Sequence, residues 1–140
     1  MTRRYLLDSG PASDCIFRRR GVFERVREVR QRGAKVGIGL PILGEIVGGV
    51  EASATRDENW PVLERGLATF VLWPFDEAAA WEYGRLYAEL RRLGRPMQQI
   101  DIQLAAIALS LGSCTVVTTD SDLSAVPGLR VEDWTAAPAP

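Results

Sequence analysis

The chain contains no histidine among its 140 residues. This absence excludes serine–histidine–aspartate and cysteine–histidine catalysis, and it excludes zinc bound through imidazole. Cysteine is almost as scarce, because Cys15 and Cys114 are the only two, and they lie far apart without a spacing typical of metal ligands. Free cysteines are usually buried, so we interpret both as small buried thiols. Carboxylates are therefore the side chains left to carry catalysis.

Long hydrophobic runs are also missing. No apolar run approaches the roughly 20 residues that a membrane-spanning helix needs, so we expect neither an integral membrane protein nor a membrane partner. The first apolar run is cut by Asp8 too early for a signal peptide, which predicts a cytoplasmic protein. The length and composition suit one globular domain, residues 1–134, followed by a flexible tail of small residues and proline at 135–140.

Positive charge comes almost entirely from arginine, since Lys35 is the single lysine. The net charge of −1 excludes binding to nucleic acid through overall positive charge. Arginine nevertheless suits bidentate contact with phosphate better than lysine does, and it gathers in four clusters at 3–4, 18–20, 25–32 and 91–95. Phosphate contact by one of these clusters and ordinary charged helix surfaces both remain open interpretations.

Apolar runs separated by turn residues predict strands that alternate with helices. The expected strands are 3–7, 35–40, 70–73, 115–119 and 129–131. After a turn that begins at Ser9, the expected helices start at residue 13 or 14 and then cover 22–31, 41–51, 60–68, 77–93 and 98–111, with a short helical turn at 122–125. This alternation is typical of an α/β domain with a mostly parallel sheet and helices on both of its faces.

Acidic residues stand where several of these elements meet. Asp8 ends the first predicted strand, Asp120 ends the fourth, and Glu45 follows the second by about one helical turn, half-buried beside an apolar helix face. Asp101 lies near the start of a helix whose other face is apolar. Sites in open parallel sheets form beyond the carboxyl ends of the strands, so we expect the four acids to meet at one edge. Each acid alone is better explained as a turn, cap or surface residue, but such explanations do not account for all four together.

A cluster of carboxylates without histidine favours Mg²⁺ or Mn²⁺. These hard ions prefer oxygen ligands, and they take only a few protein carboxylates while keeping several waters. The reaction that such a site serves is phosphodiester hydrolysis, with one metal ion or with two ions about 3.5–4 Å apart. The sequence therefore predicts a metal-dependent hydrolase.

Seven short segments stand in a familiar order along the chain: 5–9, 40–45, 73–80, 94–96, 101–106, 118–123 and 126–134. Together they resemble the PIN domain family, and more closely its toxin-type VapC ribonucleases, over about residues 3–134. The resemblance implies a PIN-like three-layer α/β/α sandwich with a short, mostly parallel sheet of four to five strands. Residues 1–134 would then form a single PIN-like domain.

The resemblance also implies a set of site residues. Asp8, Glu45 and Asp101 would bind Mg²⁺ or Mn²⁺ and act in catalysis, together with a fourth acid from the Thr-Thr-Asp-Ser-Asp segment. Asp120 ranks ahead of Asp122 as the fourth ligand because it is nearer the strand end, and both stay open. Gly10 stands where the family usually has asparagine, and the family's usual residues before the third acid are also replaced, but neither change removes a ligand.

The implied function is a metal-dependent endoribonuclease that hydrolyses RNA phosphodiester bonds and is the toxin of a type II toxin–antitoxin pair. Such proteins are typically homodimers, cut structured RNAs such as transfer RNA, and are neutralised by a small cognate antitoxin whose tail enters the active-site groove. The tryptophans and Leu86, Leu90 and Leu93 would then belong to the core or the dimer interface, with base stacking by tryptophan as the alternative.

Two other functions are compatible with parts of this pattern. The altered residue after Ser9 favours a PIN-fold module that binds RNA or protein with weak or no nuclease activity, which Mn²⁺ binding would distinguish from a nuclease. A phosphatase that uses a phospho-aspartate would usually need a second acid two residues after Asp8, where this chain has Gly10.

Overall fold

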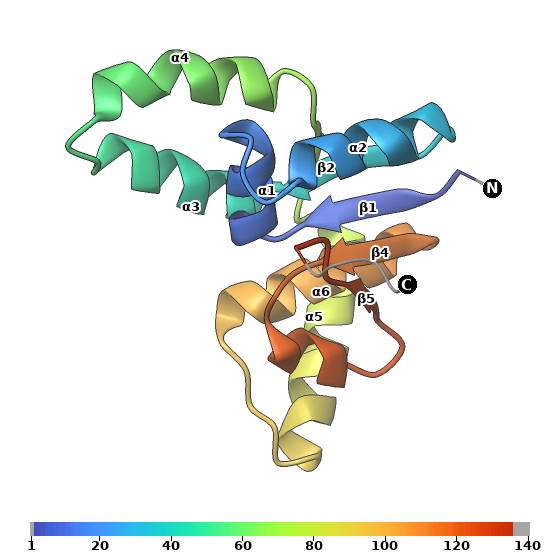
Figure 1. Ribbon diagram of the computed structural model, residues 1–140. Coiled ribbons are helices and arrows are strands. Elements are labelled where there is room, and N and C mark those ends of the chain that lie inside the picture. The colour runs from blue at the N-terminus through green and yellow to red at the C-terminus, as the bar shows by residue number, and fades with distance from the viewer. Residues whose placement is uncertain (1, 136–140) are drawn as a thin grey trace.

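Five parallel strands form one sheet in the order β3-β2-β1-β4-β5 (Figure 1). The structure is a computed structural model that describes residues 2–135, so the predicted tail lies outside the described residues apart from Thr135. The strands are β1 (Arg4–Leu7), β2 (Lys35–Gly39), β3 (Val71–Trp73), β4 (Cys114–Val117) and β5 (Arg130–Glu132). The predicted α/β class and the sheet of four to five strands are confirmed.

Helices cover both faces of the sheet (Figure 1). The chain moves from β1 to β2 to β3 in one direction and then returns to β4, so right-handed connections place the earlier and later helices on opposite faces. The first group is α1 (Ser9–Ile16), α2 (Val22–Gln31), α3 (Leu40–Glu51) and α4 (Arg56–Leu67). The second group is α5 (Glu77–Arg92) and α6 (Gln99–Leu111), and a short 3-10 helix, η1 (Ser121–Ala125), joins β4 to β5.

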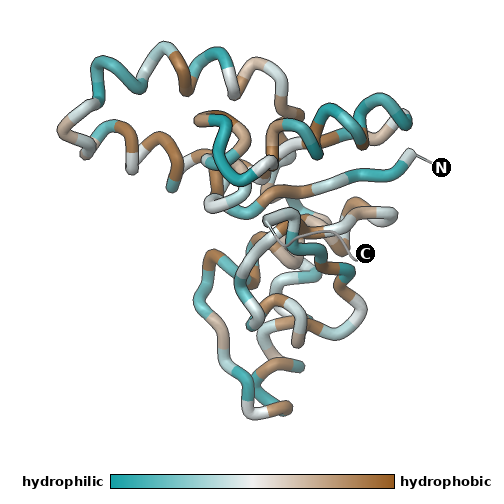
Figure 2. Tube along the Cα trace, in the orientation of Figure 1, coloured by the Kyte–Doolittle hydropathy of each residue, from teal (hydrophilic) through white to brown (hydrophobic). Residues whose placement is uncertain are grey.

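The central strands are apolar because both of their faces are buried. Leu6, Ile38 and Val116 are completely inaccessible, and apolar residues follow the strands and the inner sides of the helices in Figure 2. Both cysteines are buried, as the sequence predicts, and burial raises the pKa of Cys15 to about 11 and that of Cys114 to about 12. Among residues 2–135, no helix has the length and apolar character that crossing a bilayer would require.

Two predicted helix starts are wrong. α1 begins at Ser9 rather than at residue 13 or 14, because Asp8 caps it and because Pro11 falls in the first turn, where a missing N–H has no partner to lose. α4 begins at Arg56 rather than at residue 60, so Pro61 lies inside the helix. The polar residues before Trp60, which suggested a loop, form the first turn of this helix instead.

β2 and β3 approach each other very closely at Gly37. Gly37 pairs with Val71, and a Cβ atom on Gly37 would overlap the carbonyl oxygen of Val71. Glycine is therefore required here for the packing of two backbones.

Substituting Gly37→Ala should lower the free energy of unfolding by about 2–4 kcal/mol, because the backbones of β2 and β3 must separate. The control is Gly48→Ala on the exposed side of α3, where a Cβ would meet nothing within 4 Å. That change should raise stability by about 0.5–1 kcal/mol through helix propensity. Urea unfolding of both variants measures the difference, and two variants of equal stability would contradict this close approach.

Candidate metal centre

Asp8 is held firmly at the carboxyl end of β1. Its backbone N–H donates to the carbonyl of Val117, with 2.9 Å between N and O, which extends the pairing of β1 with β4. Its Oδ1 accepts from the backbone N–H of Ser9 at 2.8 Å, and its Oδ2 accepts from the hydroxyl of Thr118 at 2.8 Å. Both carboxylate oxygens thus have a donor, and the side chain has a fixed orientation at the edge of the sheet.

Thr118 connects two of the acidic residues. Its side chain is buried, its Oγ1 donates to Asp8, and the same oxygen accepts from the backbone N–H of Asp120 at 3.0 Å. Its own backbone N–H donates to the carbonyl of Glu132 at the end of β5. Sequence analysis missed this residue, because its role depends on the pairing of β1 with β4.

Asp120 and Asp122 lie at the start of η1. Asp120 caps η1, and its Oδ1 accepts from the backbone N–H of Asp122 at 2.9 Å. Asp120 is half-buried, whereas Asp122 is exposed. The turn thus places Asp120 closer to the sheet than Asp122.

Asp101 lies in the first turn of α6, and the charges of the other four acids act on its carboxyl group. Burial raises the pKa of Asp101 to about 6, and the negative charges of Asp8, Asp120, Glu45 and Asp122 raise it as well. The structure therefore brings the five sequence-predicted acids to the carboxyl edge of the sheet, within range of mutual electrostatic repulsion.

Glu45 differs in one respect from the expectation. It was expected to be half-buried, but it is exposed, because its position in α3 lies beside the apolar stripe of Ile42, Ile46 and Val50 and faces outward. Partial burial of its carboxyl group, followed by the charge of Asp8, still raises the pKa of Glu45. Glu45 therefore approaches the other acids from the α3 side.

No cation balances these five acids. Among the described residues none of them takes part in an ion pair, whereas the nearby buried Asp14 pairs with Arg19 at 3.3 Å. As their side chains stand, no three acidic or cysteine residues within residues 2–135 are close enough to share an ion.

Two hollows flank the acids. One, of about 540 Å³, lies between α1, α3 and α4, and it is lined by Ser9, Gly10, Glu45 and Asn59 among others. We call it the α1–α3 groove. A Cβ atom on Gly10 would meet nothing within 4 Å, so glycine leaves the groove open where the family usually carries asparagine. The other hollow, of about 270 Å³, lies between η1 and the α5–α6 connection and includes Asp122.

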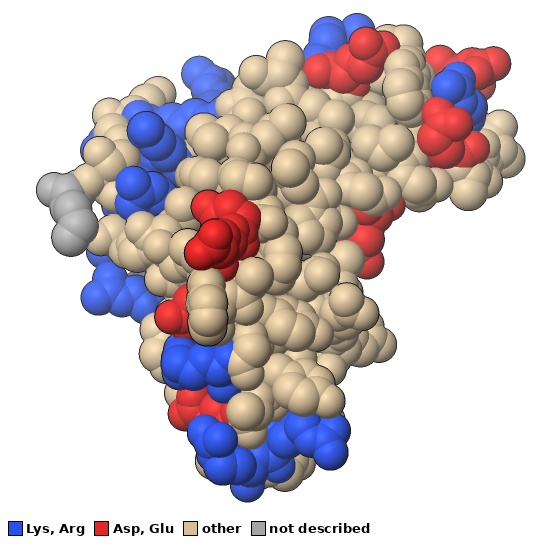
Figure 3. Space-filling model, turned by 180° about the vertical axis from the view of Figure 1, so that it is seen from behind, with Lys and Arg blue, Asp and Glu red and all other residues tan. Residues whose placement is uncertain are grey.

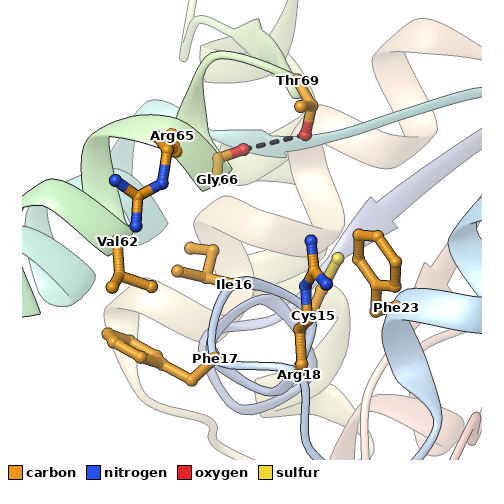
Figure 4. A pocket seen from close by; sticks show the side chains of 9 residues that line it. All are labelled: Cys15, Ile16, Phe17, Arg18, Phe23, Val62, Arg65, Gly66 and Thr69. Carbon is orange, nitrogen blue, oxygen red and sulfur yellow. Dashed lines mark hydrogen bonds between the residues drawn. The ribbon is translucent and has the colours of Figure 1, made fainter.

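A third cavity, of about 440 Å³, has a different character (Figure 4). It lies between α1, α2 and α4, and apolar side chains such as Ile16, Phe17 and Phe23 line it, together with Cys15. None of the five acids takes part in it. Because burial raises the pKa of Cys15 to about 11, the thiol is protonated at neutral pH and offers no nucleophile. The chemistry therefore belongs to the acidic edge.

Comparison with known proteins agrees with this arrangement. The sequence matches the model of the PIN domain family over residues 5–129. The chain belongs to the PIN domain family. This PIN domain is 33% identical over 132 residues to the tRNA(fMet)-specific endonuclease VapC of Shigella flexneri, which covers 94% of this chain and 98% of the relative. It is 30% identical to the protein of the same name from Salmonella typhimurium, with the same coverage. The resemblance to VapC proteins is thus confirmed.

Solved structures show the same fold. A chain in the crystal structure of VapBC2 from Rickettsia felis, bound to a promoter DNA fragment, superposes on this PIN domain with a TM-score of 0.85 at 22% identity, over 94% of this chain and 98% of that one. A chain of DNA-bound VapBC from Salmonella typhimurium gives a TM-score of 0.75 at 29% identity, over 96% and 99%. The PIN-like sandwich expected from the sequence is confirmed.

Removing the hydroxyl of Thr118 should loosen the acidic edge of the PIN domain. Thr118→Val leaves Asp8 Oδ2 and the Asp120 N–H without their partner, so we expect a loss of about 1–2 kcal/mol in the free energy of unfolding. Affinity for Mn²⁺ should fall roughly 10–100-fold, as for other residues that orient metal ligands. The exposed neighbour Thr119→Val is the control. Calorimetric titration with Mn²⁺ that gives equal affinities for both variants would exclude this role.

Asp101 should make the metal-free protein less stable as the pH rises. Its pKa is about 6 in the fold against an ordinary 3.8, so the folded state holds this proton more tightly than the unfolded chain does. Between about pH 4 and pH 6 the free energy of unfolding should therefore fall with rising pH. Asp101→Asn should be the more stable protein at pH 7 and should lack this component, whereas the exposed Glu64→Gln should behave like wild type. Melting temperatures in EDTA across this range test it; identical profiles for wild type and Asp101→Asn would argue against a raised pKa.

Proposed function

We propose that this PIN domain is a Mg²⁺- or Mn²⁺-dependent endoribonuclease and the toxin of a type II toxin–antitoxin pair. The observation that carries the proposal is the gathering of four further carboxylates around Asp101, with no ion pair to any of the five acids among the described residues. A group of acids that raises its own pKa values is costly for the fold, and a divalent ion offsets that cost. Relatives named as endonucleases and ribonucleases support the same reaction class.

The donor set fits a hard divalent ion. Its oxygen atoms, its uncompensated negative charge and its position at the carboxyl edge of the sheet all suit Mg²⁺ or Mn²⁺. We assign Asp8, Glu45, Asp101 and Asp120 as metal ligands and catalytic residues, with Asp122 as the alternative to Asp120 as the fourth ligand. The larger effect of Asp120 than of Asp122 on the pKa of Asp101, and its link to Asp8 through Thr118, support this ranking. Nucleases of this family generally depend on a divalent metal, which when bound supplies an activated water and offsets charge on the phosphate.

The residues of the chain itself prepare the site. Thr118 and the N–H of Ser9 hold the Asp8 carboxylate in one orientation, so the ligand does not have to be ordered when an ion binds. The α1–α3 groove leads to Glu45 and presents the polar side chains of Ser9 and Asn59. At neutral pH, above the pKa of about 6, Asp101 is mostly ionised and ready to bind a cation.

We further propose a structured RNA, such as a transfer RNA, as the substrate. Support comes from two relatives, each named as a tRNA(fMet)-specific endonuclease, that match nearly the whole chain. The sheet runs from residue 4 to residue 132 and the family match from 5 to 129, which supports residues 1–134 acting as one domain. We expect the enzyme to meet its RNA in the cytoplasm.

A cognate antitoxin and a second copy of the chain are the expected protein partners. Solved neighbours that are VapBC and FitAB complexes support an antitoxin. For the homodimer, support comes from large apolar side chains that remain accessible near the open edge at β3: Leu72 is 44% exposed, Leu40 is 43% exposed and Trp81 of α5 is 74% exposed. Exposed apolar groups of this size commonly mark a protein interface.

Purified protein free of antitoxin should cleave a pool of transfer RNA in Mn²⁺ or Mg²⁺. EDTA should abolish this cleavage. Asp101→Asn should lower the cleavage rate roughly 100-fold or more, because losing a ligand costs at least as much as losing a residue that orients one. Glu64→Gln, an exposed acid on α4, is the matched control and should cleave like wild type.

The competing outcome is equally concrete. Folded protein that cleaves nothing in either metal and binds no Mn²⁺ would contradict the nuclease, and would leave a PIN-fold module that binds RNA or protein without cutting. Calorimetric titration with Mn²⁺ on the same preparation distinguishes the two.

A further inference from the structure

The exposed arginines fall into two groups according to whether an acid neutralises them. Arg32, Arg56 and Arg85 each have a carboxylate oxygen within 3.0 Å. At the end of α5, by contrast, three exposed arginines take part in no ion pair among the described residues: Arg91, Arg92 and Arg95. We call these three residues the arginine tip. Figure 3 shows basic side chains gathered at the lower end of the molecule, where the α5–α6 connection lies in Figure 1.

The backbone of the arginine tip is well defined. Gly94 has a positive φ of 68°, its N–H donates to the carbonyl of Arg91 at 3.0 Å, and the N–H of Arg95 donates to the carbonyl of Leu90 at 2.8 Å. These two bonds are the Schellman motif, which closes the helix and turns the chain back. Favourable interaction with the helix dipole accounts for Arg91 and Arg92 in the last turn, but Arg95 lies beyond the helix end and needs another explanation.

The arginine tip is continuous with the acidic edge. Arg95 and Asp122 line the same hollow of about 270 Å³, together with Met97 and Ala125. The connection that follows the tip leads directly into α6, whose first turn carries Asp101. The tip thus borders Asp122 beside η1, whereas the α1–α3 groove borders Glu45 of α3.

Other arginines are less suited to a ligand at the acidic edge. Arg4 begins β1, at the opposite end of the strand from Asp8, and it donates to the carbonyl of Gly112. Arg19 does line the α1–α3 groove, but its guanidinium pairs with Asp14 and lies over the ring of Phe17. The arginine tip therefore offers positive charge that no acid of the described residues neutralises: Arg95 borders Asp122, and Arg91 donates only to the hydroxyl of Tyr87, at 3.3 Å.

A nuclease with this site has an electrostatic difficulty, because five carboxylates repel the phosphates on either side of the cleaved bond. A single divalent ion leaves the cluster anionic, and the net charge of the chain is −1. A guanidinium group can donate two parallel hydrogen bonds to phosphate oxygens, and it remains charged at every relevant pH. Resting on the proposed nuclease function, we propose that the arginine tip binds the phosphate backbone of the RNA substrate on the η1 side of the acids.

The test measures RNA binding when cleavage is blocked. A fluorescein-labelled transfer-RNA pool is titrated with full-length protein in Mg²⁺, in an Asp101→Asn background, at several salt concentrations. The tip variant is Arg91→Gln/Arg92→Gln/Arg95→Gln, and the control with the same loss of charge is Arg3→Gln/Arg27→Gln/Arg130→Gln, three exposed arginines outside any ion pair of the described residues.

The tip variant should bind at least about tenfold more weakly, and the slope of log affinity against log salt should decrease by about 2, which is three phosphate contacts at about 0.7 each. The control should change affinity less than about twofold at the same slope. A third variant, Arg91→Lys/Arg92→Lys/Arg95→Lys, keeps the charge and should bind with intermediate affinity, which separates lost contacts from misfolding. Equal weakening of tip variant and control would overturn the proposal.

A cleavage assay in Mn²⁺ on the Asp101-containing proteins separates this inference from the proposed function. The tip variant should raise KM about tenfold with kcat nearly unchanged, because the arginines do not touch the reacting atoms. Wild-type cleavage with an unaffected tip variant would overturn the inference and leave the nuclease intact. Loss of binding by the tip variant without cleavage by any protein would support the RNA site and contradict the nuclease. Wild-type protein that neither binds nor cleaves RNA would overturn both.

Discussion

Repulsion among five carboxylates at one edge of the sheet is the constraint on which the rest of the structure depends. A parallel sheet brings the ends of β1 and β4 side by side, and the acids that follow them cannot avoid each other. The fold tolerates this because hydrogen bonds from Ser9 and Thr118 fix Asp8, while Asp120 is tied into the cap of η1. The acids are thus held near one another, and their charges add to burial, the larger cause, in raising the pKa of Asp101.

Such an arrangement exchanges stability for function. A divalent ion that bound these acids in the folded state alone would stabilise the fold, so the proposed metal binding would be linked to folding. The same negative charge would keep RNA away, which explains why positive charge should be placed near the acids rather than among them. Under the two proposals, the arginine tip would bind the RNA backbone and the acids would bind the metal ion.

The strands, the parallel sheet and the acids at the strand ends could be predicted from the sequence, because the strands are short and apolar and polar residues follow them at once. Asp8 was predicted as a site residue because it directly follows the first apolar strand. The family resemblance then related the seven segments to one another. Thr118 was missed because a hydroxyl gives no periodic signal, and its role appears only when β1 and β4 pair. The start of α4 was missed because the polar residues before Trp60 suggested a loop, although they form the first turn of the helix. Glu45 lies beside the apolar stripe of α3, and the periodicity of the sequence does not decide whether such a flanking position is half-buried or exposed.

The central claim is that these acids form a metal site, and a crystal grown with Mn²⁺ tests it most directly through the anomalous signal of the ion. The account predicts a Mn²⁺ peak at the carboxyl edge of the sheet, bound by Asp8 and Asp101 and by at least one of Glu45 and Asp120, with oxygen distances of about 2.1 Å as for Mg²⁺. The same crystals of Asp101→Asn should show a weaker peak or none. A well-ordered protein without an ion at this edge, or with Mn²⁺ bound only at unrelated surface acids, would contradict it.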